Sequence, residues 1–195
     1  MLNPQRDRDY VTIVSGLPRS GTSMMMQMID KGGIPALVDH VRKADEDNPK
    51  GYYEFEPVKQ TRKDASWLKD ASGKVVKMVH MLLLDLPTDY TYRVVFMRRH
   101  LQEVIASQNR MLVRRGKPVD ELPTDKLIAM FQAQLDKVDH HLQAHRNFRV
   151  LHVNYNEILQ DPAPAVAAVN AFLGGKLDTE AMLAVVDPSL YRNRR

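Results

Sequence analysis

The sequence predicts an α/β fold with three layers, in which a mainly parallel β-sheet is flanked by helices. Short apolar segments alternate along the chain with longer segments whose apolar residues recur at helical spacing. This alternation is typical of parallel strands joined by right-handed helical crossovers. The 195 residues suit one domain covering residues 1–195, with the 44% hydrophobic and 27% charged residues of an ordinary globular protein.

Four segments have the short, apolar, β-branched character of buried strands. They lie at residues 11–14, 74–80, 92–97 and 148–153. A helix is expected after the turn at residues 16–21, and others over residues 58–70, 101–115, 125–145 and 162–173, where apolar residues recur every three or four positions. Residues 36–57 carry little periodicity, which in a compact domain is typical of a functional loop.

Composition and charge narrow the classes of function. The net charge of +4 suits an anionic ligand, and no basic stretch is interleaved with aromatic residues, so we expect no nucleic acid partner. The chain has no cysteine and no carboxylate–histidine cluster with metal-binding spacing, so no metal is expected. The N-terminal residues lack the apolar core of a signal peptide and no run is long enough to span a bilayer, which predicts a cytoplasmic protein with no membrane partner.

The turn between the first predicted strand and helix is the most informative stretch. A strand that feeds a glycine-rich turn into a helix aims backbone N–H groups and the positive end of the helix dipole at one point, where a phosphate or sulfate fits. Gly16 and Gly21 have the spacing of a Walker A loop, but Thr22 stands where that loop has lysine. The cation comes instead from within the turn, at Arg19.

The run Pro-Arg-Ser-Gly-Thr-Ser at residues 18–23 resembles the 5′-phosphosulfate loop of the bacterial-type sulfotransferases, whose fold is P-loop NTPase-like. In that family the loop holds the sulfate end of 3′-phosphoadenosine 5′-phosphosulfate (PAPS). The resemblance therefore implies PAPS as the cofactor. It also implies six loop residues that bind the cofactor: Pro18, Arg19, Ser20, Gly21, Thr22 and Ser23.

Two further motifs extend the resemblance. Arg99 follows a predicted strand and Ser107 lies eight residues later in the next helix, a pairing that in the family holds the 3′-phosphate of the cofactor. Tyr155 follows the last predicted strand and corresponds to the tyrosine that lies beside the adenine in the family. Arg19 and His80 also follow strand ends. We therefore expect four residues to converge on one crevice at the carboxyl edge of the sheet: Arg19, His80, Arg99 and Tyr155.

The implied reaction is transfer of a sulfuryl group to an acceptor hydroxyl or amine, with release of adenosine 3′,5′-bisphosphate (PAP). Arg19 is the expected catalytic cation, and Lys77 is a second cation near the transferred group. His80 is the first choice for the general base, although the interval from Lys77 to His80 is one residue longer than in the cytosolic enzymes of the family, so that the histidine can face the other way. Three carboxylates are its rivals: Asp39, Glu54 and Glu56.

Two alternatives share parts of this pattern. A P-loop kinase or NTPase would share the glycine-rich turn, but position 22 is not lysine and no apolar strand ends in aspartate. A non-catalytic nucleotide-binding protein would share the whole loop and lack a positioned base. No motif specifies the acceptor or the oligomeric state.

Overall fold

A computed structural model of the chain describes residues 10–39, 41, 45, 51–119 and 122–187, so that residues 40, 42–44 and 46–50 of the predicted loop lie outside the described part. Within the described part, a parallel sheet of four strands has the order β2-β1-β3-β4, which confirms the predicted α/β class. The strands are β1 (Val11–Gly16), β2 (Val75–Val79), β3 (Tyr92–Arg98) and β4 (Phe148–Asn154).

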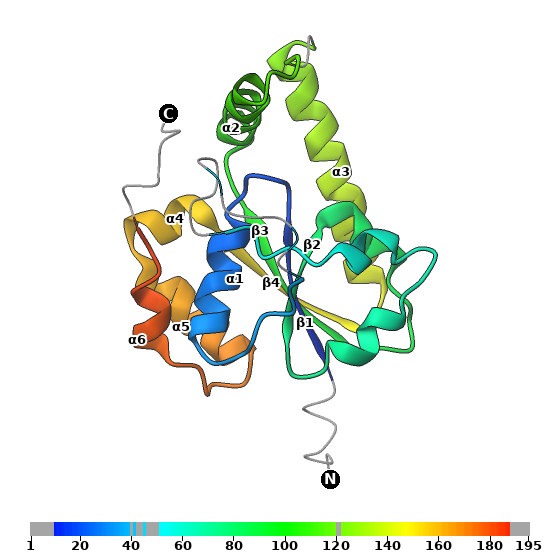
Figure 1. Cartoon of the computed structure of the whole chain (residues 1–195), viewed down its shortest axis with the longest axis vertical. Coiled ribbons are helices and arrows are strands. Elements are labelled where there is room, and N and C mark those ends of the chain that lie inside the picture. The colour runs from blue at the N-terminus through cyan, green and yellow to red at the C-terminus, as the bar shows by residue number, and fades with distance from the viewer. Residues whose placement is uncertain (1–9, 40, 42–44, 46–50, 120–121, 188–195) are drawn as a thin grey trace.

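All four strands end at the same edge of the sheet because every pairing is parallel. Gly16 at the end of β1 pairs with Val79 of β2 and with Met97 of β3, and Arg98 of β3 pairs with Asn154 of β4. The segments that follow the strands therefore leave from one carboxyl edge (Figure 1). This is the edge at which parallel sheets bind ligands.

Alternate residues of each strand pack on opposite faces of the sheet, and helices cover both faces (Figure 1). On one face, Val14 of β1 and Val95 of β3 pack against helical residues such as Met25 and Val169. The helices on this face are α1 (Thr22–Lys31), α4 (Tyr155–Gln160), α5 (Pro162–Phe172) and α6 (Thr179–Leu183).

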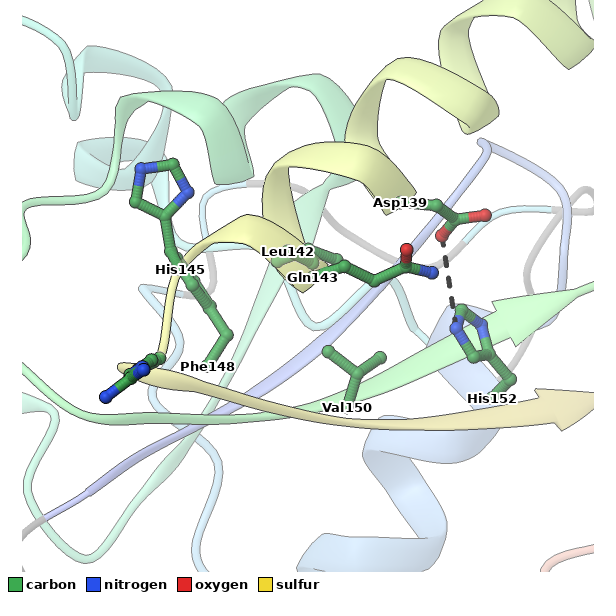
Figure 2. A pocket seen from close by; sticks show the side chains of 8 residues that line it. Asp139, Leu142, Gln143, His145, Phe148, Val150 and His152 are labelled. Carbon is green, nitrogen blue, oxygen red and sulfur yellow. Dashed lines mark ion pairs between the residues drawn. The ribbon is translucent and has the colours of Figure 1, made fainter.

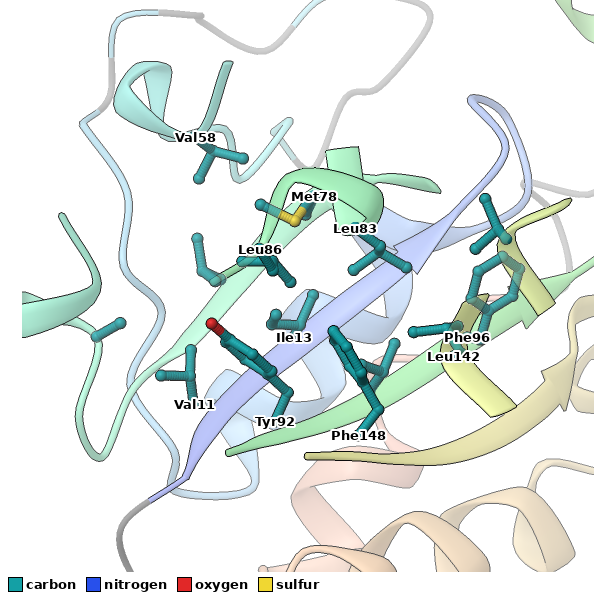
Figure 3. Packing of buried hydrophobic residues seen from close by; sticks show 14 of the residues in the cluster. Val11, Ile13, Val58, Met78, Leu83, Leu86, Tyr92, Phe96, Leu142 and Phe148 are labelled. Carbon is teal, nitrogen blue, oxygen red and sulfur yellow. The ribbon is translucent and has the colours of Figure 1, made fainter. Parts of the chain in front are cut away.

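The opposite face carries the larger apolar cluster, part of which is drawn in Figure 3. There Ile13 of β1 and Phe96 of β3 pack against Leu142 of a long helix and Leu83 of a short one. The elements on this side are α3 (Thr124–Ala144) and three 3-10 helices, η1 (Glu56–Gln60), η2 (Ser66–Asp70) and η3 (His80–Asp85). Helix α2 (Leu101–Arg114) follows β3 and rises beside α3 beyond the carboxyl edge (Figure 1).

Helix α1 begins directly after the glycine-rich turn, as predicted. Gly21 is its N-cap and Gly32 its C-cap. Its apolar face is buried against the sheet because the methionines and the isoleucine recur at helical spacing. The buried residues are Met25, Met26, Met28 and Ile29.

The helix predicted over residues 58–70 is wrong, because η1 and η2 occupy this region as two separate 3-10 turns. The Asp64 carboxylate accepts the Ser66 N–H at 2.9 Å, and this local bond turns the backbone between the two elements. The short helices α4 and α6 are additional to the predicted ones. Among the described residues, no helix combines the length and the apolar character that a membrane span requires.

Candidate active site

The turn after β1 has a compact conformation that presents the first turn of α1. Arg19 and Gly21 have left-handed backbone conformations, with φ of 72° and 93°. Ser20 is buried, and both its N–H, at 3.2 Å, and its hydroxyl, at 2.7 Å, donate to the carbonyl of Leu17. The N-cap residue Gly21 provides no side-chain cap for α1. The amides at the start of α1 are therefore suited to an anionic ligand.

Close packing explains why two positions of this turn are glycine. A Cβ atom on Gly21 would lie 2.3 Å from the ring of Tyr155. A Cβ atom on Gly16 would lie 2.6 Å from Ser20 Oγ and 2.7 Å from the carbonyl oxygen of Met97. These contacts are too short for any side chain, so the turn keeps its shape only with glycine at the two positions.

The structure brings two of the sequence motifs together at the carboxyl edge of β1 and β3. Arg19 Nε donates to the hydroxyl of Ser107 at 3.0 Å. Arg99 Nη1 donates to the carbonyl oxygen of Arg19 at 2.9 Å. Ser107 is buried in α2, and the side chain of Arg99 is only 6% exposed. The phosphate-loop candidate and the Arg99–Ser107 pair are therefore in direct contact.

The side chain of Arg99 also contacts residues of α2 and α4. Its Nε donates to the buried carboxylate of Glu103 at 3.0 Å, and its guanidinium lies over the ring of Tyr155 at 4.6 Å. Asn156 donates from Nδ2 to both oxygens of Glu103 at 3.0 Å. Tyr155 is 8% exposed and packs between Arg99 and the backbone of Gly21.

Lys77 lies on the α1 side of β2, beside the start of α1. Its Nζ donates to the carbonyl oxygen of Tyr52, which also accepts the Ser23 hydroxyl at 3.3 Å. The same Nζ lies 3.9 Å from the carboxylate of Glu54, and both side chains keep a small exposed fraction of 13% and 19%. The segment at residues 52–54 is thus tied to the loop residue Ser23 and to β2.

His80 is not part of this group of residues. Its ring is buried on the α3 side of the sheet, where Nε2 lies 3.0 Å from Oε1 of Gln134. Burial lowers the pKa of His80 below its ordinary value of 6.5, and the nearby positive charge of Arg98 lowers it further, against the opposing effects of Gln134 and the Gly16 backbone. Lys77 and His80 therefore point to opposite faces of the sheet.

The two remaining carboxylates have other partners. The Asp39 carboxylate accepts the backbone N–H of Glu56 at 2.5 Å and that of Val41 at 3.0 Å, so it holds the local backbone conformation. The side chain of Glu56 is 43% exposed and pairs with Lys59 at 2.5 Å. Of the three rival carboxylates, Glu54 is the one beside Lys77 and the residues tied to Ser23.

A separate hollow of about 270 Å³ lies between the end of α3 and the edge strand β4 (Figure 2). None of the predicted site residues lines this hollow. Its lining consists of apolar and polar residues from both elements and from the turn between them: Asp139, Leu142, Gln143, His145, Arg146, Phe148, Val150 and His152. Among the described residues, no group of three or more His, Cys, Asp or Glu side chains is arranged to hold a metal ion.

Sequence reasoning did not single out Glu103 or Asn156. The available signal for Glu103 was an acidic residue four positions after Arg99, in the first turn of the helix that follows it, where the two charges can pair. It also lies beside Val104 and Ile105, which are buried. Asn156 carried no comparable signal, because its contact with Glu103 joins elements far apart in the sequence.

Comparison with known proteins adds a family match to this geometry. Residues 51–179 match the model of the sulfotransferase family. The matched region contains Glu54, Lys77, Arg99, Ser107 and Tyr155, and it begins after the turn at residues 16–21. A search of curated proteins gave no match.

Solved structures resemble the chain over a longer stretch. The sulfotransferase domain from the curacin biosynthetic pathway has a TM-score of 0.56 and 14% identity, with 91% of this chain and 78% of that chain covered. A sulfotransferase from Mycobacterium tuberculosis H37Rv has a TM-score of 0.56 and 16% identity, with 91% and 70% covered. Retinol dehydratase in a complex with retinol and PAP has a TM-score of 0.55 and 16% identity, with 95% and 67% covered. At these identities the likeness concerns the fold.

Proposed function

The chain belongs to the sulfotransferase family, and we propose that it transfers a sulfuryl group from PAPS to an acceptor hydroxyl or amine. The family match confirms the predicted family, and the cofactor and the acceptor are our proposal. The observation that carries the finer proposal is the direct contact of the turn at Arg19 with Arg99 and Ser107. PAPS carries a phosphosulfate at the 5′ position of its ribose and a phosphate at the 3′ position. Two adjacent groups of hydrogen-bond donors in the protein match these two anionic groups.

The residues at the carboxyl edge fit such a ligand. The amides at the start of α1 and the guanidinium of Arg19 suit the 5′-phosphosulfate, and we assign residues 18–23 to that end. Ser107 and Arg99 suit the 3′-phosphate because a buried hydroxyl and a buried guanidinium form strong bonds to phosphate oxygens. Tyr155 lines the site through its contact with Arg99.

The bound cofactor would supply the activated sulfuryl group. In the proposed transfer the acceptor would form its bond to sulfur while the bond from sulfur to the bridging oxygen would break, and the electrons of that bond would stay on the 5′-phosphate of PAP. We propose that Arg19 and the loop amides neutralise the charge that grows on that oxygen. Lys77 is the second cation that can reach this region, since its Nζ lies on the carbonyl oxygen that Ser23 also contacts.

We assign the general base to Glu54 rather than to His80. A base must reach the acceptor proton within hydrogen-bonding distance. Glu54 is partly exposed and lies 3.9 Å from Lys77, on the side of the sheet that carries Ser23. The ring of His80 is 3% exposed and its Nε2 is directed to Gln134, so it has little access to an acceptor.

Calorimetry of the purified protein with PAP, with ATP plus magnesium and with AMP tests the cofactor assignment. We expect binding of PAP in the micromolar range and much weaker binding of AMP, which lacks the 3′-phosphate. Ser107→Ala should weaken the binding of PAP and leave that of AMP unchanged. Binding of ATP with magnesium, together with no binding of PAP, would reject the proposal.

Transfer of labelled sulfate from PAPS to a panel of alcohols, phenols and amines tests the reaction itself. The expected result is labelled product with some member of the panel, formed more slowly by about a hundredfold to a thousandfold in the Arg19→Ala variant. Tight binding of PAP with no transfer to any member, in a panel that a known sulfotransferase accepts, would favour a non-catalytic nucleotide-binding protein.

A further inference from the structure

The carboxylate that pairs with Arg99 is buried in the fold. Glu103 lies in the first turn of α2 and is 4% exposed. A buried charge is costly unless it is paired and hydrogen-bonded. Glu103 meets this condition with an ion pair to Arg99 and with the amide of Asn156, each at 3.0 Å. The pair is therefore built into the fold with its partners in place.

The peptide that joins Arg19 to Ser20 is held at both ends. Its carbonyl oxygen accepts Arg99 Nη1 at 2.9 Å, and its N–H donates to the carbonyl of Leu17 at 3.2 Å. Arg19 has a φ of 72°, a left-handed conformation that costs free energy in any residue with a Cβ atom. The hydrogen bond from Arg99 helps to hold this conformation in the turn.

The orientation of Arg99 is in turn set by Glu103. Nε of Arg99 is fixed on the Glu103 carboxylate, and its guanidinium carbon lies over the Tyr155 ring, 4.6 Å from the ring centroid. With Nε fixed, Nη1 is directed at the Arg19 carbonyl. Asn156 fixes the carboxylate, and its Oδ1 accepts the N–H of His100 at 3.3 Å, which ties the start of α4 to the start of α2.

We propose that Glu103 is a positioning residue, which holds Arg99 in the orientation that keeps the peptide after Arg19 in its ligand-ready conformation. Glu103 itself would touch neither the nucleotide nor the acceptor. The inference rests on the proposed function for its consequence in catalysis, but the effect on the shape of the loop holds for the protein without ligand. Asn156 supports Glu103 in this role.

Amide hydrogen exchange of the ligand-free protein tests the effect on the loop, with Glu103→Gln as the main variant. Gln places an NH₂ donor against the donors of Arg99 or Asn156, so the ion pair and one acceptor are lost together. We expect exchange in the peptide covering residues 17–22 to become faster by about tenfold, as for loss of a hydrogen bond to a charged group. Exchange in β4 should stay within about twofold once the rates are corrected for global stability.

Three further variants separate an effect on the loop from general destabilisation. Thr61→Val removes the hydrogen bond that Trp67 Nε1 donates to a buried hydroxyl at 3.1 Å, in the η1–η2 region, and should lower stability without affecting the loop. Glu103→Asp retains the charge and should restore part of the slow exchange. If Glu103→Gln does not fold, Asn156→Ala keeps the ion pair and should give a smaller change at the loop in the same direction.

Equal loop exchange in the native protein and the Glu103→Gln variant would overturn the proposal, as would an equal acceleration in Thr61→Val. PAP titrations of the same samples separate this outcome from a failure of the proposed function. If the native protein binds PAP, Glu103→Gln should weaken binding by about tenfold. If the native protein does not bind PAP, the proposed function fails while the exchange result still decides the role of Glu103 in the loop.

Discussion

Arg19 and Ser107, 88 positions apart in the sequence, are joined by a hydrogen bond of 3.0 Å from the guanidinium Nε to the hydroxyl. The bond links the turn after β1 to the helix after β3, which are neighbouring strands in the sheet. One cation thus spans the two groups of donors that we assign to opposite ends of one nucleotide. Variants of Arg19 and Arg99 should therefore separate the contribution of each group to binding and to turnover.

Arg19→Ala should lower turnover more than it lowers the affinity for PAP. The guanidinium is assigned to charge that grows only as the sulfur–oxygen bond breaks, and removal of one such stabilising group costs on the order of a hundredfold to a thousandfold in rate. Turnover from initial rates and PAP affinity from calorimetry should be measured on the same preparation. Arg19→Lys keeps the charge and should recover part of the rate. Equal losses of rate and affinity in Arg19→Ala would remove the catalytic role.

Arg99→Ala should weaken the binding of PAP and also destabilise the fold. Removal of the guanidinium leaves the carboxylate of Glu103 buried without its ion-pair partner, which costs about 3–5 kcal/mol in comparable cases. The double variant Arg99→Met, Glu103→Leu should regain stability while PAP binding stays weak. Chemical denaturation gives the free energy of unfolding for each variant. Full stability in Arg99→Ala would mean that the ion pair contributes little.

Glu54→Gln should reduce turnover by about a hundredfold or more, the usual contribution of a general base, with little change in the affinity for PAP. Glu56→Gln is the matched control, because Glu56 is two residues away and 43% exposed, and it should retain normal turnover. Initial rates at saturating PAPS and calorimetry with PAP should be measured on the native protein and on both variants. An unchanged rate in Glu54→Gln would show that Glu54 is not the general base, and His80 would again be a candidate for that role.

The strands and most of the helices could be predicted because their apolar residues follow the period of each element. Val94, Val95 and Phe96, for example, alternate between the two faces of β3 as the strand pattern requires. The helix over residues 58–70 was wrong since Asp64 binds a backbone amide locally, and a side-chain turn of this kind overrides a weak helical pattern.

The candidate site was predictable only where its residues follow strand ends. Parallel strands end at the same edge of the sheet, and this brings together Arg19, Arg99 and Tyr155. The direction of a side chain just beyond a strand is less predictable, and His80 shows why: the extra residue after Lys77 turns its ring toward α3. The supporting contact of Glu103 with Asn156 joins distant segments and has no local pattern.

The buried ring of His80 should make the stability of the protein depend on pH. Its pKa is lowered by burial in the folded state, so the unfolded chain binds a proton near pH 6.5 that the folded chain does not bind until the pH is lower. The free energy of unfolding should therefore fall as the pH decreases from 7.5 through 6.5, by up to about 1.4 kcal/mol per pH unit for one proton. His141 and His152, whose pKa values burial also lowers, act in the same direction.

Denaturation between pH 7.5 and 5.5 can isolate this contribution. His80→Gln removes the titrating group, so its free energy of unfolding should fall less steeply over this range than that of the native protein. Identical slopes in the native protein and His80→Gln would show that the buried ring does not titrate differently in the two states. A slope that became steeper in His80→Gln would contradict the sign of the effect.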